Sequence, residues 1–202
     1  MYVIFGERMR LHMFTQEISE LMGLLEEAAN TRKNDNGMRD YIIVRLMYQA
    51  GLRVSELTGL DVKHIVFEND DTVLVEIEKS KNKKHGRVVS VCDPKLFELL
   101  SLWNRGIEGD VPMFVSNKGN KMSVRAIQRV CKKWLGKVVC DELAHAHTLR
   151  HSFGAESVKC GVKLPFIKTQ MGHSSITSTQ VYTEMTEEES KMAYRNVRLV
   201  KE

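Results

Sequence analysis

Cysteines are few in this sequence and never occur in pairs. Cys92, Cys131, Cys140 and Cys160 stand far apart in the 202 residues, and no CxxC spacing joins any two of them. This pattern argues against a cysteine-rich zinc module and against a disulfide framework. It fits a reducing cytoplasmic compartment.

The sequence also lacks segments that would direct it into a membrane. No apolar run approaches the roughly 20 residues that a membrane-spanning helix needs, and charges interrupt the apolar stretch in residues 1–13, unlike in a signal peptide. Hydrophobic residues make up 43% of the chain and charged residues 28%, which is enough apolar material for a globular core. We expect one globular domain of ordinary size, or two small ones, without membrane contact.

Acidic residues are missing from one long stretch. Residues 111–140 hold seven Lys or Arg and no Asp or Glu, and residues 79–87 hold five more cations. The net charge of +4 hides this asymmetry, because residues 1–78 carry −6 and residues 79–202 carry +10. Solvated helix faces normally mix both signs, so the runs favour a polyanionic partner such as nucleic acid.

The hydrophobic pattern predicts helices on both sides of a short stretch of strands. A period of two indicates strands at 65–67, 73–77 and 87–91. The helical period predicts helices at 15–28, 38–50, 54–59, 94–103, after Ser123, and at 148–160, 164–171, 175–182 and 187–197. We therefore expect a mainly α fold with a small three-stranded antiparallel β-sheet, from which a lysine-rich hairpin projects.

The helix after Ser123 has two contrasting faces. Its predicted buried side is formed by Val124, Ile127, Val130 and Trp134. Its exposed side is then cationic and carries Arg125, Arg129, Lys132 and Lys133.

Three segments could contribute chemistry, although each alone has an ordinary structural explanation. In the first, Arg53 follows a helix-stopping glycine, and Glu56 lies three residues on, where its carboxylate could hold the guanidinium. The second is the lysine hairpin. In the third, Thr148 is the expected helix cap, so that His147 and Arg150 face a phosphate near the helix N-terminus.

Zinc is the alternative for the third segment, because His147 and His151 stand at i, i+4 spacing. However, Thr148 replaces the glutamate of a metalloprotease helix, and Arg150 between two ligands would repel a dication. We predict no metal site and expect His151 to be a packed or capping side chain.

A fourth segment, GHSSITSTQVY, contains His173 and, nine residues later, Tyr182. Taken in order, GLRVSEL, the lysine hairpin, HTLRHSF and this segment resemble the tyrosine recombinases, the phage-integrase and Xer-type site-specific recombinases. The resemblance covers about residues 14–197. It implies the tyrosine-recombinase catalytic-domain fold and cleavage of double-stranded DNA through a covalent 3′-phosphotyrosine, without metal, cofactor or ATP.

The resemblance also implies a role for each matching residue. Tyr182 is the nucleophile, and two arginines, Arg53 and Arg150, stabilise the charge of the transition state. His147 is the general-base candidate and His173 a hydrogen-bond donor to the phosphate. Lys81 aligns best with the general acid; Lys79 and Lys83 remain candidates, because the turn is one residue longer than the compact family form. DNA contacts are expected from Lys79, Lys83, Lys84, Arg125, Arg129, Lys132 and Lys133, with Glu56 supporting Arg53.

Family members usually carry a helical core-binding domain before this region. We therefore expect residues 1–13 to be an N-terminal extension or linker remnant and residues 14–202 to be the catalytic domain, either an excised fragment or a minimal recombinase. The resemblance favours a homotetramer on DNA in the nucleoid. A DNA-binding module without turnover and relaxation of DNA alone are the alternatives. A test for covalent adducts separates the first of them, because only a module without turnover forms no adduct.

Overall fold

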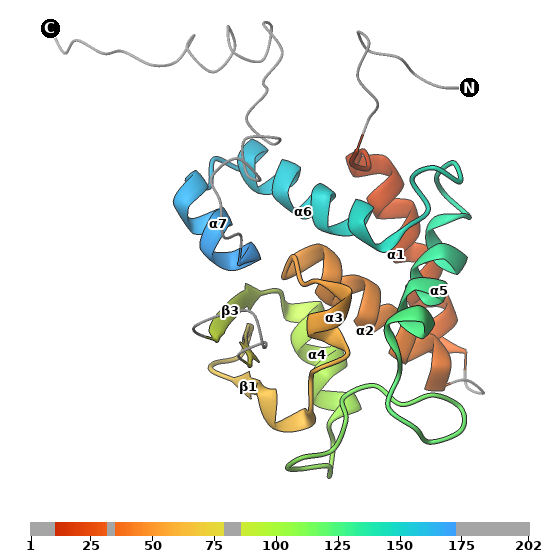
Figure 1. Ribbon diagram of the computed structural model, residues 1–202, viewed down its shortest axis with the longest axis vertical. Coiled ribbons are helices and arrows are strands. Elements are labelled where there is room, and N and C mark those ends of the chain that lie inside the picture. The colour runs from red at the N-terminus through yellow and green to blue at the C-terminus, as the bar shows by residue number, and fades with distance from the viewer. Residues whose placement is uncertain (1–10, 32–34, 79–85, 173–202) are drawn as a thin grey trace, which may run out of the picture.

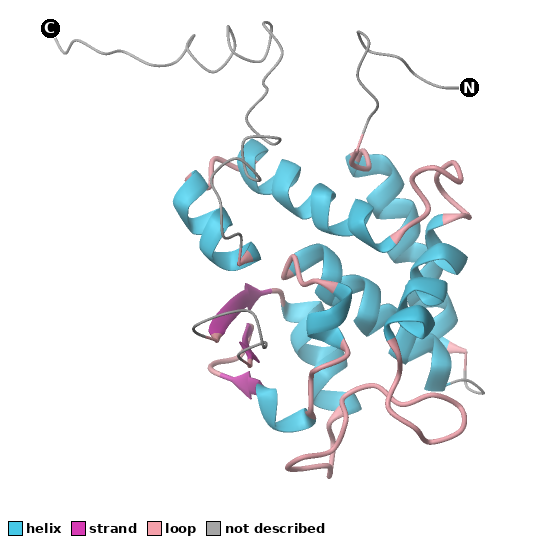
Figure 2. Cartoon of the chain, in the orientation of Figure 1, coloured by secondary structure: helices cyan, strands magenta, loops and turns pink. Residues whose placement is uncertain are grey.

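The computed structural model of the protein describes residues 11–31, 35–78 and 86–172 (Figure 1). Its elements follow the predicted order of helices, a small sheet and further helices (Figure 2). They are α1 (Thr15–Asn30), α2 (Asp35–Gln49), α3 (Val54–Leu57), the 3₁₀ turn η1 (Val62–His64), β1 (Ile65–Phe67), β2 (Thr72–Ile77), β3 (Arg87–Cys92), α4 (Pro94–Trp103), α5 (Val124–Leu135), α6 (Ala146–Lys159) and α7 (Leu164–Met171). In these described ranges no helix combines the length and the apolar character needed to cross a membrane.

Helix α2 forms the centre of the helical part. It contacts α1, α4, α5 and α6, which surround it in Figure 1. Ile42, Ile43, Leu46 and Met47 are each at most 1% exposed. A helix covered on several sides needs apolar residues around its circumference, and α2 has them. The segment that follows α2 and contains Gly51 therefore starts from a helix that is packed on several sides.

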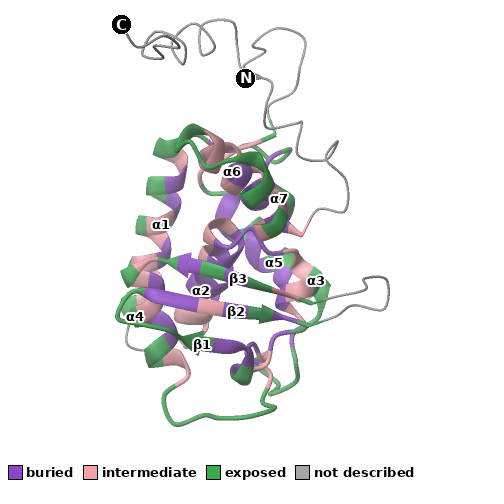
Figure 3. Ribbon diagram, turned by 90° about the vertical axis from the view of Figure 1, so that its left-hand side faces the viewer, coloured by how far each residue is buried: buried purple, intermediate pink, exposed green. Residues whose placement is uncertain are grey.

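The sheet is antiparallel, in the order β1-β2-β3, which confirms the predicted mainly helical fold with three strands. Its inner face is apolar, with Val75 and Val89 buried opposite each other, and its outer face exposes Glu76 and Val88. Helix α7 packs against β3 and exposes its outer surface (Figure 3). The sheet therefore brings the end of β2 and the start of β3 close to the α3 and α7 region.

Candidate active site

Arg53 lies where α2 ends and α3 begins. Gly51 makes the turn with a φ of 60°, and a Cβ there would come within 2.5 Å of the Phe153 ring. Glycine is required on both conformational and steric grounds. The Glu56 carboxylate accepts hydrogen bonds from the Arg53 backbone N–H at 2.8 Å and from the Arg53 guanidinium at 3.0 Å. The contact predicted from their spacing is present.

Arg150 projects from α6 and is buried, with 5% of its surface exposed. Its guanidinium donates hydrogen bonds to the carbonyl oxygens of Gly51 and, at 2.7 Å, of Met171. Such partners are what a buried cation requires. Arg150 is thus fixed between the end of α2 and the end of α7.

The start of α6 differs from the prediction. The helix begins at Ala146, and His145 rather than Thr148 is the cap, because Nδ1 of His145 accepts the backbone N–H of Thr148 at 3.3 Å. The prediction of Thr148 as the cap is wrong, since Thr148 is buried inside the first turn and its own N–H is the one that needs a partner.

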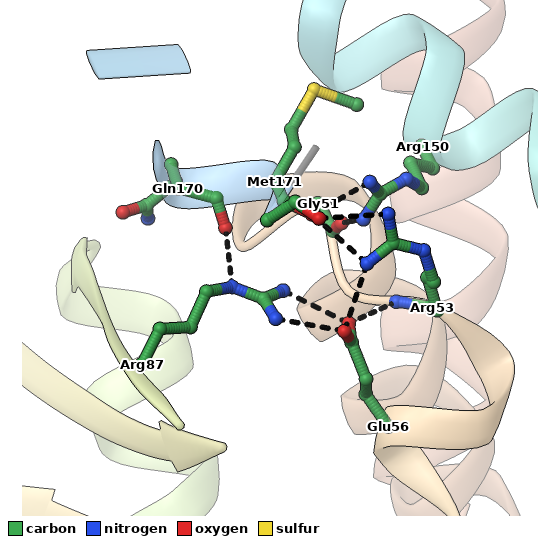
Figure 4. A network of polar contacts seen from close by, with 8 residues as sticks. Gly51, Arg53, Glu56, Arg87, Arg150, Gln170 and Met171 are labelled. Carbon is green, nitrogen blue, oxygen red and sulfur yellow. Dashed lines mark hydrogen bonds and ion pairs between the residues drawn. The ribbon is translucent and has the colours of Figure 1, made fainter. Parts of the chain in front are cut away.

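The two guanidiniums converge at the C-terminus of α7 (Figure 4). Arg53 donates to the carbonyl oxygens of Met171 at 3.2 Å and Gly172 at 3.0 Å, and Arg150 shares the Met171 oxygen. The last carbonyls of a helix carry partial negative charge, which attracts both cations. Two forked and permanently charged donors in one place suit an anion with several oxygens, such as a phosphate.

His147 is exposed in the first turn of α6, three residues before Arg150. Desolvation of its ring, followed by the positive charges of His145, Arg150 and Arg53, lowers the pKa of His147. The lowered pKa favours the neutral imidazole, which is the form that can accept a proton.

His151 is half-buried, and its ring centroid lies 6.5 Å from that of His147. Desolvation, with the charge of His147 next, lowers the pKa of His151 as well. Within the described part of the chain, no group of three or more His, Cys, Asp or Glu side chains is placed to hold a metal ion.

The remaining predicted catalytic residues and hairpin contacts lie outside the described residues, and their roles stay predictions. They are Lys79, Lys81, Lys83, Lys84, His173 and Tyr182. The helices predicted at 175–182 and 187–197 also lie outside the described residues. His173 directly follows Gly172, whose carbonyl Arg53 contacts.

Arg87 belongs to the same polar network but was not among the predicted site residues. It is the first residue of β3, and its guanidinium binds both oxygens of Glu56, at 2.7 and 2.9 Å. In the sequence Arg87 is one cation in a basic run. Its partner lies 31 residues away, so no local spacing could have revealed the pair.

Glu56 is ionised to an unusually low pH. Burial alone would raise its pKa, but hydrogen bonds from the Arg87 side chain and the Arg53 backbone, with the charges of both arginines, lower it to about 2. The free carboxylate titrates near 4.5. The contribution of Glu56 to folding is thus complete above the unfolded pKa and is lost as the pH falls through the folded pKa.

We therefore expect Glu56→Gln to remove one component of acid sensitivity. Between pH 5 and pH 2 the wild-type protein should lose about 3 kcal/mol more of its free energy of unfolding than the variant loses. Urea denaturation followed by circular dichroism at several pH values measures this difference. Glu76→Gln, on the exposed face of β2, is the control for loss of a carboxyl group. Equal acid sensitivity of the wild-type protein and Glu56→Gln would contradict the assigned ionisation.

Helix α5 presents the predicted cationic face. Arg125, Arg129 and Lys132 are exposed and line one open groove together with Gln128. The prediction that Val124 is buried is wrong: it is 39% exposed, because it is the first residue of the helix and precedes the contact with the core that begins at Ile127.

Lys133 differs from the other cations of α5. Its ammonium binds the buried carboxylate of Asp40 at 3.1 Å, and the indole N–H of Trp134 donates to the same oxygen at 2.9 Å. Lys133 therefore anchors α5 to α2 in addition to being a predicted DNA contact.

Comparison with known proteins shows the family of this chain. The model of the phage integrase family matches residues 13–189. The chain belongs to the phage integrase family. Among the relatives of this chain, the tyrosine recombinase XerC of Haemophilus influenzae (strain PittEE) is 30% identical over 181 residues, which cover 89% of this chain and 58% of the relative. XerC of Escherichia coli O127:H6 is 32% identical over 149 residues, which cover 73% of this chain and 49% of the relative. The chain thus spans about half the length of these relatives.

Solved structures share the fold of this chain. The XerA recombinase superposes with a TM-score of 0.73 at 24% identity, covering 96% of this chain and 68% of that one. XerH bound to its difH substrate superposes with a TM-score of 0.72 at 19% identity. The match covers 97% of this chain and 57% of the XerH chain. The catalytic domain of bacteriophage HP1 integrase superposes with a TM-score of 0.59 at 20% identity. The match covers 93% of this chain and 95% of the HP1 domain.

Proposed function

We propose that this integrase-family chain acts as the catalytic domain of a tyrosine-type site-specific DNA recombinase. The convergence of Arg53 and Arg150 at the end of α7, directly before His173, carries the proposal. Relatives named tyrosine recombinases and the pre-cleavage complex of XerH with its DNA substrate support it.

In the proposed reaction the hydroxyl of Tyr182 attacks the scissile phosphorus. A bond forms between phosphorus and the tyrosine oxygen, and the bond to the 5′-oxygen breaks, leaving a 3′-phosphotyrosine and a free 5′-hydroxyl. A 5′-hydroxyl from a second strand reverses the step, so the bond energy is conserved. Arg53 and Arg150 stabilise the additional negative charge of the pentacoordinate transition state.

Two proton transfers accompany the step. A tyrosine hydroxyl has a pKa near 10 and needs a base. His147 takes this proton, and its lowered pKa favours the neutral ring beforehand. Lys81 gives a proton to the leaving 5′-oxygen, while His173 donates a hydrogen bond to the phosphate.

The cationic face of α5 contacts the DNA backbone in this proposal. Replacing Arg125, Arg129 and Lys132 together by glutamine should weaken binding to all DNA sequences alike. The logarithm of the association constant falls linearly with the logarithm of the salt concentration, and the magnitude of this slope should decrease by about 3. Each phosphate contact contributes about 0.9 to it. Fluorescence anisotropy at several salt concentrations measures this slope.

A matched control replaces three exposed cations outside α5, namely Lys63, Arg105 and Lys159, by glutamine. This variant loses the same net charge but should keep a slope close to that of the wild-type protein. Equal slopes for the wild-type protein and the α5 variant would refute this face as a DNA contact.

The function itself is tested by incubating the protein with nicked or supercoiled double-stranded DNA and then adding SDS. We expect a covalent protein–DNA adduct that survives the detergent. No adduct at any salt concentration would indicate a DNA-binding module without turnover.

The proposed assembly is a homotetramer on DNA in the bacterial nucleoid, and light scattering with and without DNA distinguishes it from a monomer.

A further inference from the structure

Arg87 lies where three parts of the site meet. It begins β3, and its side chain is 13% exposed. Its two terminal nitrogens bind the two oxygens of Glu56 in parallel. This bidentate geometry is the strongest and most directional form of an arginine–carboxylate pair. The pair joins the sheet to α3, and Arg53 directly precedes that helix as its N-cap residue.

The Glu56 carboxylate is shared unequally between two arginines. Arg87 occupies both oxygens through its side chain, whereas Arg53 reaches the carboxylate with one side-chain nitrogen and its backbone N–H. The other terminal nitrogen of Arg53 turns to the carbonyl of Gly172. Without Arg87, the carboxylate could bind the fork of Arg53 bidentately and draw it away from the end of α7.

The opposite side of Arg87 holds the last turn of α7. Its Nε donates to the carbonyl of Gln170 at 3.0 Å, and the Gln170 side chain donates to the carbonyl of Ser90 in β3 at 2.7 Å. A Cβ on Gly172 would lie 2.7 Å from an Arg87 nitrogen, and Gly172 has a φ of 62°. Glycine at this position leaves the space that the guanidinium fills.

We propose that Arg87 is a positioning residue for strand cleavage. It holds the Glu56 carboxylate and the end of α7 so that the fork of Arg53 stays at the phosphate position beside Arg150 (Figure 4). The inference rests on the proposed recombinase function and assigns Arg87 no contact with DNA.

The test compares single-turnover cleavage of a nicked DNA substrate, at saturating protein, with the dissociation constant for the same DNA. Arg87→Ala should cleave about 100-fold more slowly, because displacement of a catalytic group by about 1 Å has an effect of this size. Its dissociation constant should stay within about twofold. Arg87→Lys should recover only part of the rate, since an ammonium cannot make two parallel bonds to a carboxylate.

The double variant Arg87→Ala with Glu56→Gln separates positioning from general structural support. Removing the carboxylate charge releases Arg53, so the double variant should cleave faster than Arg87→Ala alone. If Arg87 only supported the fold, the second substitution would slow the reaction further or leave it unchanged, and that result would overturn the proposal.

Arg45 provides a matched control. It is equally shielded, with 13% of its side chain exposed, and pairs with Asp93 at 3.1 Å, between α2 and the start of α4. Arg45→Ala should lower the melting temperature but cleave within about twofold of the wild-type rate at a temperature where it is folded. Cleavage by Arg87→Ala or Arg87→Lys at the wild-type rate would refute the role of Arg87. Absence of cleavage by the wild-type protein in the same assay would instead refute the recombinase function.

Discussion

Tyr182→Phe is expected to form no covalent adduct with DNA. The substitution removes only the oxygen that the proposed reaction bonds to phosphorus, so the rate of adduct formation should fall by at least about 10⁴-fold. Binding to the same DNA should remain within about twofold, because the phenyl ring is retained. Denaturing gel electrophoresis of a trapped nicked substrate measures the adduct, and anisotropy measures the binding.

Tyr48→Phe is the matched control for this substitution. Desolvation, with the charges of Glu156 and Cys160 next, raises the pKa of Tyr48 to about 12, which makes its phenol a poor nucleophile. Tyr48→Phe should therefore form the adduct as the wild-type protein does. An adduct that survives Tyr182→Phe, or is lost in Tyr48→Phe alone, would assign the nucleophile to another residue.

The second large effect is expected for Arg150→Lys. Arginine presents a rigid fork of donors, whereas lysine presents one compact charge that cannot contact Gly51, Met171 and a phosphate together. Loss of such transition-state donors should slow cleavage by about 1,000-fold, or about 4 kcal/mol. Single-turnover kinetics on a nicked substrate measure the change.

Stability must be followed in the same samples, because Arg150 is buried and its carbonyl partners are left less well satisfied by lysine. Melting curves identify a temperature at which Arg150→Lys is fully folded, and the rates are compared there. A folded Arg150→Lys protein that cleaves within about tenfold of the wild-type rate would exclude Arg150 from the transition state.

Local patterns in the sequence predict much of this structure. Helix α7 has the predicted bounds, Leu164–Met171, because Pro165 lies in its first turn and Gly172 follows its end. The Arg53–Glu56 contact follows from a spacing of three residues at the start of a helix. Both features depend on interactions between near neighbours in the chain.

Features that depend on tertiary contacts could not be predicted in this way. The Arg87–Glu56 pair requires the register of β2 and β3 and the packing of α3 beside them, neither of which any short segment specifies. His145 rather than Thr148 caps α6, because the folded core buries Thr148. The exposure of Val124 likewise depends on where α5 meets the core.

The most direct test of Tyr182 as the nucleophile is mass spectrometry of the wild-type adduct after nuclease and trypsin digestion. The expected tryptic peptide runs from Thr169 to Lys191 and contains a single tyrosine, Tyr182. We predict that this peptide carries the mass of a nucleotide joined through its 3′-phosphate to Tyr182. A nucleotide on any other peptide, or an adduct joined through a 5′-phosphate, would contradict the proposed mechanism.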